Sequence, residues 1–281
     1  MHGLKVYLYG GSIKGEGIVM NKEKAHEIVE YMVEQGRKLP EISGKVEDIG
    51  VKKEFLTEYD LKIERGLKSI VDKMQGKHFF FSEEENDKFE KHESVWIADP
   101  ISSTQRFIYG QPNYAVVVSH MQNGRVDFGA VFVPTADDLY VATEDDGVFK
   151  NDNKIEERKE LGRKIIYAPV YKESKWQEKI IKDLEEKLKQ EFEVFGSQGS
   201  FAYNYCLVAE GKFDGVVSLT KDAFPEFAGC YIANKSGVIA TNIKGEKDIS
   251  HKDRVFICGH EGIYNDLFGM VKSMEGELQY E

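Results

Sequence analysis

The chain has few cysteines, fewer basic than acidic residues and no long apolar run. Its three cysteines, Cys206, Cys230 and Cys258, are far apart and form no Cys-x-x-Cys pair. They stand in apolar contexts, which predicts reduced core residues rather than a zinc or redox site. No stretch approaches the roughly 18 apolar residues that a membrane span needs, and the first residues lack a signal-peptide core. We therefore expect a cytoplasmic protein with no membrane segment.

The charge balance limits the partners. The 281 residues include 38 Lys and Arg against 49 Asp and Glu, a net charge of −11. This balance argues against binding to nucleic acid or to anionic membranes. It does not exclude a phosphorylated substrate, because bound divalent cations can make a site locally positive on an acidic protein. With 41% hydrophobic residues, the chain can bury a sizeable core.

The order of the expected elements divides the chain into two halves. After a short strand and a glycine-rich turn in residues 1–20, residues 22–38 and the stretch from Thr57 have apolar residues at helical spacing. Strands follow, with a strong hairpin signal at Asn123-Gly124. The sequence predicts a first half, 1–155, of helices over a mostly antiparallel sheet, and an α/β half, 156–281, packed together as one unit.

Strands and helices alternate in the second half. Its expected strands are 164–170, 192–195, 213–219, 237–240 and 255–258, and its expected helices are 175–190, 200–210, 224–235 and 261–274.

One stretch, Trp96–Phe107, joins a strand to polar residues that suit a cation and a phosphate. The strand is expected to break at Asp99-Pro100, since proline cannot supply a ladder N–H. Residues 102–104 are Ser, Ser and Thr, good N-cap residues for a short helix whose N–H groups can face an anion. A second carboxylate cluster, 83–85, follows the apolar run 79–81. Two acidic strand ends suggest a shared cation site.

The stretch Trp96–Phe107 resembles the hallmark of the inositol monophosphatase family, Trp-x-x-Asp-Pro-Ile-Asp-Gly-Thr-x-x-Phe. The matching residues are Trp96, Asp99, Pro100, Ile101, Thr104 and Phe107. The resemblance implies a layered α+β and α/β sandwich (αβαβα) like that of inositol monophosphatase and fructose bisphosphatase. It also implies Mg²⁺ as cofactor, a small phosphorylated substrate and a homodimer.

Four weaker signatures follow the family's order. Thr57-x-x-Asp60 resembles its Thr-x-x-Asp helix start, although the same residues could merely cap a helix. Ser82-Glu83-Glu84 stands where the family has Gly-Glu-Glu, with a solvated acidic loop as the alternative. Gly199–Ala202 resembles a Gly-Ser-x-Ala helix start, where Ser200 could also serve as an N-cap. Pro225–Gly229 stands for Trp-Asp-x-Ala-Ala.

The resemblance assigns roles to residues of the first half. Glu83, Asp99 and the carbonyl of Ile101 would hold the first Mg²⁺. Thr104 and Asp60 would orient the attacking water, and Glu83 belongs with them to the catalytic set.

The remaining assignments fall where this chain departs from the family. Asp99, Ser102 and Glu226 would hold the second ion, but Ser102 replaces an aspartate and Glu226 replaces another. A serine brings no charge, and Glu is longer than Asp by one methylene. Ser103 adds a side chain where the family has glycine. The implied substrate contacts are Ser102, Ser103, Thr104, Ser200 and Glu226.

Three functions follow as hypotheses. The first is a Mg²⁺-dependent phosphatase for an inositol monophosphate-like ester, which the retained residues Asp60, Glu83, Asp99 and Thr104 favour. The second is a non-catalytic relative that binds partners or regulates, which the altered second-ion ligands favour. The third is a 3′-nucleotidase that acts on a bisphosphate nucleotide.

Overall fold

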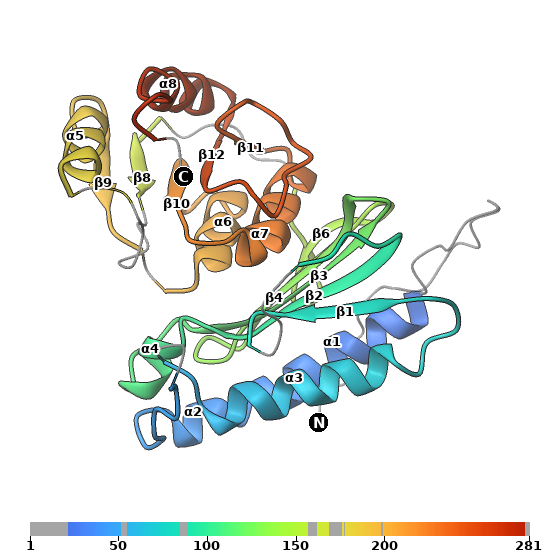
Figure 1. Cartoon of the computed structure of the whole chain (residues 1–281). Helices are drawn as coiled ribbons and strands as arrows, with labels where there is room; N and C mark the ends of the chain where they lie inside the picture. The colour runs from blue at the N-terminus through green and yellow to red at the C-terminus, as the bar shows by residue number, and fades with distance from the viewer. Residues whose placement is uncertain are drawn as a thin grey trace. The chain divides into compact units, whose positions relative to one another are not determined.

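A computed structural model describes residues 22–51, 55–84, 89–156, 162–168, 176, 178–197 and 199–278 (Figure 1). The strand and turn predicted in residues 1–20 lie outside this part of the chain. The chain divides into two compact units, Met1–Lys154 and Ile155–Glu281. The packing of the two halves as one unit stays a prediction.

The first unit holds a seven-stranded sheet whose strands follow one another in chain order. β1 pairs with β2 in parallel, and the other pairs are antiparallel, as the sequence predicts for this half. The elements are α1 (Lys22–Gly36), α2 (Leu39–Ile42), α3 (Glu58–Val71), β1 (Phe79–Ser82), β2 (Ser94–Ser102), α4 (Thr104–Ile108), β3 (Ala115–Gln122), β4 (Arg125–Val133), β5 (Asp138–Thr143), β6 (Gly147–Lys150) and β7 (Asn153–Lys154).

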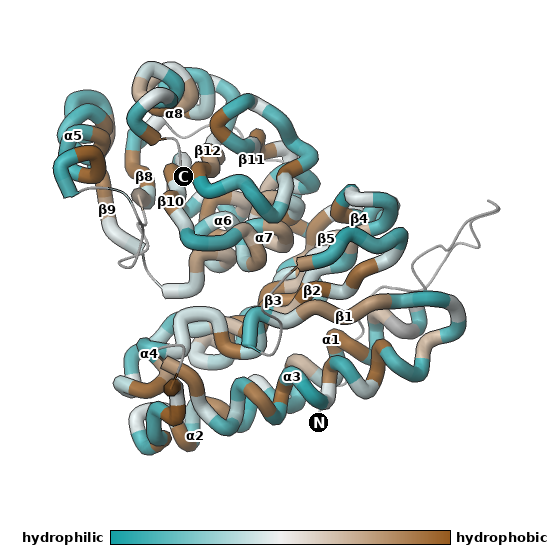
Figure 2. Tube along the Cα trace, in the orientation of Figure 1, coloured by the Kyte–Doolittle hydropathy of each residue, from teal (hydrophilic) through white to brown (hydrophobic). Residues whose placement is uncertain are grey.

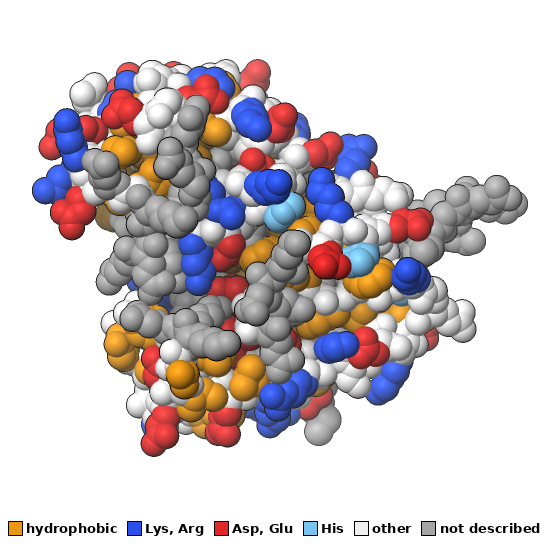
Figure 3. All heavy atoms as spheres, viewed as in Figure 1, with side chains coloured by type: hydrophobic (Ala, Val, Ile, Leu, Met, Phe, Trp, Pro, Cys, Tyr) orange, Lys and Arg blue, Asp and Glu red, His pale blue; other side chains and the backbone are white. Residues whose placement is uncertain are grey.

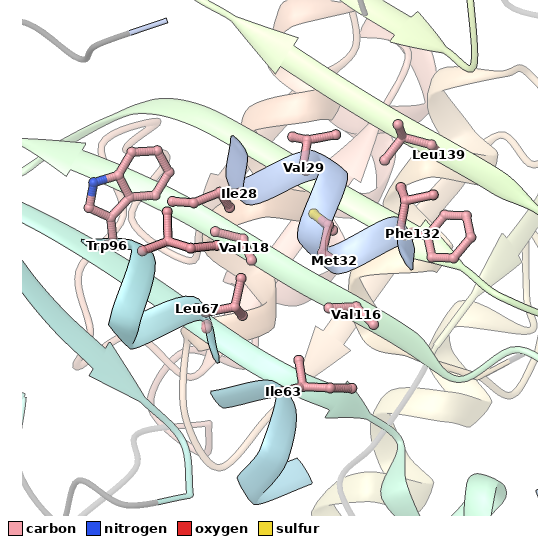
Figure 4. Packing of buried hydrophobic residues seen from close by; sticks show 14 of the residues in the cluster. Ile28, Val29, Met32, Ile63, Leu67, Trp96, Val116, Val118, Phe132 and Leu139 are labelled. Atoms are coloured by element: carbon pink, nitrogen blue, oxygen red, sulfur yellow. The ribbon is translucent and has the colours of Figure 1, made fainter. Parts of the chain in front are cut away.

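Helices α1 and α3 cover one face of this sheet (Figure 1). In both helices brown apolar residues alternate with teal polar ones at helical spacing (Figure 2). Their apolar stripes meet alternate residues of the strands, because side chains of a strand point to opposite faces in turn. The packed residues include Ile28, Val29, Met32, Ile63, Leu67, Trp96, Val116, Val118, Phe132 and Leu139 (Figure 4).

The predicted hairpin between β3 and β4 is confirmed. Asn123 and Gly124 both have positive φ, 52° and 81°, as a two-residue turn of type I′ requires. The turn fixes the antiparallel register of β3 with β4.

The second unit is a five-stranded mixed sheet in the order β11-β12-β10-β8-β9. Its elements are β8 (Ile165–Tyr167), α5 (Glu178–Leu188), β9 (Glu193–Phe195), α6 (Phe201–Ala209), β10 (Gly215–Leu219), α7 (Phe224–Lys235), β11 (Ile239–Asn242), β12 (Val255–Gly259) and α8 (Glu261–Lys272). On β10, Val217 and Leu219 join the core with α5 and α8. Ser218 points the other way and bonds to α7. The alternation predicted for this half is confirmed in the described residues, while residues 169–170, 175 and 177 of the predicted elements lie outside them.

The surface and the cysteines fit the composition. Acidic and basic side chains are interspersed on the face in view (Figure 3). Cys206, Cys230 and Cys258 are buried, and none of them forms a disulfide. None of the helices in the described ranges has the length and apolar character that crossing a bilayer requires.

Candidate metal centre

Two acidic residues of the first unit lie side by side, Glu83 just after β1 and Asp99 within β2. These two strands run parallel, with Ser82 opposite Ala98. Glu83 follows Ser82, and its backbone N–H donates to the Ala98 carbonyl at 3.2 Å. Asp99 follows Ala98 and is 3% exposed. Since paired strands run about 4.8 Å apart, the backbones of Glu83 and Asp99 are neighbours across the β1–β2 pair.

The strand break predicted at Asp99-Pro100 is wrong, because β2 continues to Ser102. Asp99 pairs with Val117 and Ser102 pairs with Ala115, so β2 has one residue more than β3 over this stretch. This bulge accommodates Pro100, which cannot donate to the ladder. It also turns the chain just after Asp99, before the Ile101 carbonyl.

Ser103 adopts a left-handed backbone conformation, with φ 69° and ψ 49°. This conformation costs a non-glycine residue roughly 1–2 kcal/mol, which gives a physical reason for glycine at this position of the hallmark. Ser103 is the N-cap residue of the five-residue helix α4, but its side chain makes no capping hydrogen bond. The predicted helix is therefore present, while the predicted side-chain cap from Ser103 is absent.

Asp60 joins the start of α3 to the hallmark stretch. One carboxylate oxygen, Oδ2, accepts hydrogen bonds from the Thr57 backbone N–H at 2.9 Å and from the Thr57 hydroxyl. The other, Oδ1, accepts from the Thr104 hydroxyl at 3.3 Å. That hydroxyl also lies 2.7 Å from the Ile101 carbonyl oxygen, to which it can donate. Asp60 therefore caps α3 and contacts Thr104 at once, so the two interpretations of this residue are compatible.

The two predicted residues of the second unit are both fully buried. Ser200 is the N-cap residue of α6, but its side chain makes no capping hydrogen bond. Glu226 lies in the first turn of α7, and its Oε1 accepts a hydrogen bond from Ser218 at 2.9 Å. Its Oε2 has no hydrogen-bond partner among the described residues. Burial, with repulsion from Asp222, raises the pKa of Glu226 to about 8, against the opposing effect of Ser218.

A further buried carboxylate, Glu64, was not predicted to belong near the site. It lies one turn after Asp60 on α3 and accepts a hydrogen bond from Ser82. A sequence signal for it existed, because Glu64 falls on the line of apolar residues that continues with Leu67 and Val71. A charged residue on that stripe needs a buried polar partner.

A second polar network lies at the opposite end of β2 from Asp99. Ser94 Oγ is 2.6 Å from His78 Nδ1 and 2.8 Å from His120 Nε2, and His120 Nδ1 is 2.6 Å from Asp127 Oδ1. Ser94 and His120 are both 0% exposed, so no substrate can reach the serine hydroxyl. The network joins residues of β2, β3 and β4 to the chain just before β1.

The donor atoms of the first unit suit a hard cation. Carboxylates and backbone carbonyls are the oxygen ligands that Mg²⁺ accepts. Glu83, just after β1, and Asp99 and Ile101, in the last part of β2, offer such oxygens. No three His, Cys, Asp or Glu side chains of the described residues form a metal-binding group by themselves. A first ion would therefore rely on two carboxylates and a carbonyl, completed by water or substrate.

Comparison with known proteins places these features in a family. The model of the inositol monophosphatase family matches residues 19–272. A "Fructose-1,6-bisphosphatase/inositol-1-monophosphatase" of Thermotoga maritima is 26% identical over 242 residues, 84% of this chain and 90% of the relative. A "Nus factor SuhB" of Vibrio cholerae is 26% identical over 214 residues, 75% of this chain and 80% of the relative.

A solved structure shows the fold. An IMPase/NADP phosphatase complexed with Mg²⁺ and phosphate aligns with a TM-score of 0.75 at 17% identity, over 90% of this chain and 96% of that one. The layered α/β architecture predicted from the sequence is thereby confirmed.

Proposed function

Because the chain belongs to the inositol monophosphatase family, we propose that it is a Mg²⁺-dependent phosphatase for a small phosphate ester of the inositol monophosphate kind. One observation carries the proposal: the Thr104 hydroxyl contacts both Asp60 and the Ile101 carbonyl, just beyond Asp99. Ile101 and Thr104 come from β2 and the adjoining α4, whereas Asp60 comes from α3, 44 positions before Thr104. The Thermotoga relative and the Mg²⁺ and phosphate complex support the same chemistry.

The chain's own residues would hold the cation and position a water. Glu83, Asp99 and the Ile101 carbonyl would bind the first Mg²⁺, which neutralises phosphate charge and lowers the pKa of a water when bound. Thr104 accepts a proton from the attacking water while its own hydroxyl proton passes to Asp60 Oδ1. The hydrogen bonds from Thr57 to Oδ2 fix the carboxylate so that Oδ1 faces Thr104.

The second ion would use Asp99 with Ser102 and Glu226. A serine hydroxyl can ligate Mg²⁺, but it brings no charge, so we expect this ion to bind weakly. The buried Glu226 Oε2, which has no hydrogen-bond partner among the described residues, leaves one carboxylate oxygen available to a ligand. Ser103 and Ser200 complete the proposed substrate contacts, together with Ser102, Thr104 and Glu226.

A regulatory role is the second candidate. It is favoured by the relative described as a Nus factor and by the neutral Ser102 in the second-ion set. A protein with this role would keep the fold and bind a partner without turnover. Fold alone does not decide between the two functions.

A substrate panel tests the proposal. We expect phosphate release from an inositol monophosphate when Mg²⁺ is present and none when it is chelated. The panel should include fructose 1,6-bisphosphate, NADP and a nucleotide 3′,5′-bisphosphate, the last to test the 3′-nucleotidase alternative. Phosphate release is measured at several Mg²⁺ concentrations, and Asp60→Asn serves as the inactive control. No release from any member of the panel would favour the regulatory candidate.

Restoring the family's residues should strengthen the second ion. The triple variant Ser102→Asp, Ser103→Gly, Glu226→Asp returns two short carboxylates and removes the strain at Ser103. We expect turnover to rise by at least about tenfold, equivalent to ~1.4 kcal/mol in barrier, and the Mg²⁺ concentration for half-activity to fall. Each single change should do less, because ligands of one ion act as a unit. A Mg²⁺ titration of phosphate release for the parent, the singles and the triple gives the answer. Unchanged titrations would mean that Ser102 and Glu226 serve no second ion.

A further inference from the structure

Glu64 is a buried carboxylate outside the proposed ligand and catalytic sets. It is 1% exposed, and its neighbours Ile63 and Leu67 belong to the hydrophobic core of the first unit. Residues four apart lie on the same face of a helix, so Glu64 shares its face of α3 with Asp60. Burying a carboxylate among apolar groups is costly unless polar contacts offset the lost hydration. The position of Glu64 therefore directs attention to the group that it contacts.

One group that Glu64 contacts is Ser82, the last residue of β1. The Ser82 hydroxyl donates to Glu64 Oε2 at 2.6 Å, and both residues are almost fully buried. The same oxygen of Ser82 accepts from the Glu84 backbone N–H at 3.4 Å. The single hydroxyl proton of Ser82 thus goes to Glu64, while a lone pair is available to the turn that follows.

This contact fixes the residue next to it. Glu83 lies between Ser82 and Glu84, and its own N–H donates to Ala98 of β2. The turn that carries Glu83 is thereby tied to α3 through a hydroxyl and to β2 through a carbonyl. Glycine, which the family has at position 82, has no hydroxyl, so the tie to α3 is a feature of this chain.

We infer that Glu64 is a positioning residue for the cation site, acting through Ser82 to hold Glu83 where it can ligate. The inference rests on the proposed function, in which Glu83 binds the first Mg²⁺. Hydrogen-bonded partners that orient a metal ligand are worth about 10- to 100-fold in metal affinity. Removing the Glu64–Ser82 hydrogen bond should therefore weaken Mg²⁺ binding as well as lower the stability of the fold.

A double-mutant cycle with Glu64→Gln and Ser82→Ala tests this. Both changes are small, and Glu64→Gln keeps an acceptor oxygen without the charge. Calorimetric Mg²⁺ titration of each purified protein should show each single variant weakened by about 10- to 100-fold. The double variant should be about as weak as the weaker single variant, because the two residues act through one bond. At saturating Mg²⁺ the turnover number should return to near the parent's, since Glu64 does not touch substrate.

Leu67→Ala is the matched control, because it removes packing one turn further along the same face of α3. It should lower stability to urea while the Mg²⁺ affinity stays within about twofold of the parent's, as for an independent site. A parent that binds no Mg²⁺ would refute the proposed function itself. The positioning role alone would be refuted if the parent binds Mg²⁺ and the variants Glu64→Gln and Ser82→Ala bind it equally well. It would also be refuted if these variants lose no more Mg²⁺ affinity than Leu67→Ala does.

Discussion

Replacing Asp99 by alanine is expected to abolish Mg²⁺ binding measurable by calorimetry and to lower phosphate release by at least about 100-fold. Partners that merely orient a ligand cost 10- to 100-fold when removed, so loss of a ligand itself should cost no less. Asp99 is proposed to serve both ions, and its place at the bulge of β2 is fixed by the pairing with β3. The measurement is phosphate release with the best substrate of the panel at a Mg²⁺ concentration that saturates the parent.

Two comparisons make the Asp99 result specific. Asp138→Ala removes a carboxylate from β5 of the same sheet, where it pairs with Lys150 at 2.7 Å, and should leave activity and Mg²⁺ binding unchanged. Without metal, Asp99→Asn should be at least as stable as the parent, because it removes the charge of a buried carboxylate whose backbone lies beside that of Glu83. An Asp99→Ala protein that binds Mg²⁺ as the parent does would rule out the proposed ligand set.

The second large effect is expected in the stability of the metal-free protein as pH changes. Burial, with repulsion from Asp222, raises the pKa of Glu226 to about 8, whereas glutamate in an unfolded chain has a pKa of about 4.3. Between these values the native protein keeps a proton that the unfolded chain has released. Stability from this group is therefore present at low pH and is lost as pH rises towards 8. At about 1.4 kcal/mol per pH unit, the loss is on the order of 5 kcal/mol as an upper bound.

Glu226→Gln should remove this dependence, since the amide does not titrate. Urea unfolding with a chelator, at several values between pH 5 and 8.5, should show the variant gaining on the parent by several kcal/mol as pH rises. Glu261→Gln, which removes an exposed carboxylate from the first turn of α8, is the control and should track the parent. If the free energy of unfolding changes with pH in the same way for Glu226→Gln and the parent, Glu226 is not buried in its uncharged form.

Binding of a second ion would reverse the protonation of Glu226. A carboxylate must be ionised to ligate a metal, so binding releases a proton. At pH 7 the heat of Mg²⁺ binding to the parent should therefore depend on the ionisation enthalpy of the buffer. The heat of Mg²⁺ binding to Glu226→Gln should not depend on the buffer. If the buffer changes the heat of binding equally for both proteins, Glu226 is not a ligand.

Much of the fold could be predicted from residues near one another in the sequence. The apolar spacing of Ile28, Val29 and Met32 identifies α1, and the turn chemistry of Asn123-Gly124 identifies the hairpin. Helix α7 begins and ends where the sequence predicts, at Phe224 and Lys235. These signals are local, because helical and strand periods recur within a few residues and positive φ depends on the residue itself.

The acidic motifs likewise led to the prediction that Glu83 and Asp99 share a cation site. The parallel pairing of β1 with β2 makes the backbones of these two residues neighbours, although Asp99 lies within β2 and not at its end. The expectation that proline ends a strand failed at Pro100, where β2 continues because it forms a bulge against β3. Whether proline ends a strand depends on how that strand pairs with its neighbouring strand, and the neighbouring strand lies in a different part of the sequence.

Tertiary structure decided the polar contacts around the site that join residues far apart in the sequence. Asp60 meets Thr104 across 44 positions of the chain and Glu64 meets Ser82 across 18. Position 103 acquires its left-handed conformation between a bulged strand and a helix. The sequence by itself determined which carboxylates and hydroxyls are present and on which elements they lie. Only the pairing of β1 with β2 and the packing of α3 decided which of these groups meet. A hydrogen bond requires two atoms to lie within a few ångströms, and these atoms belong to residues that are far apart in the sequence.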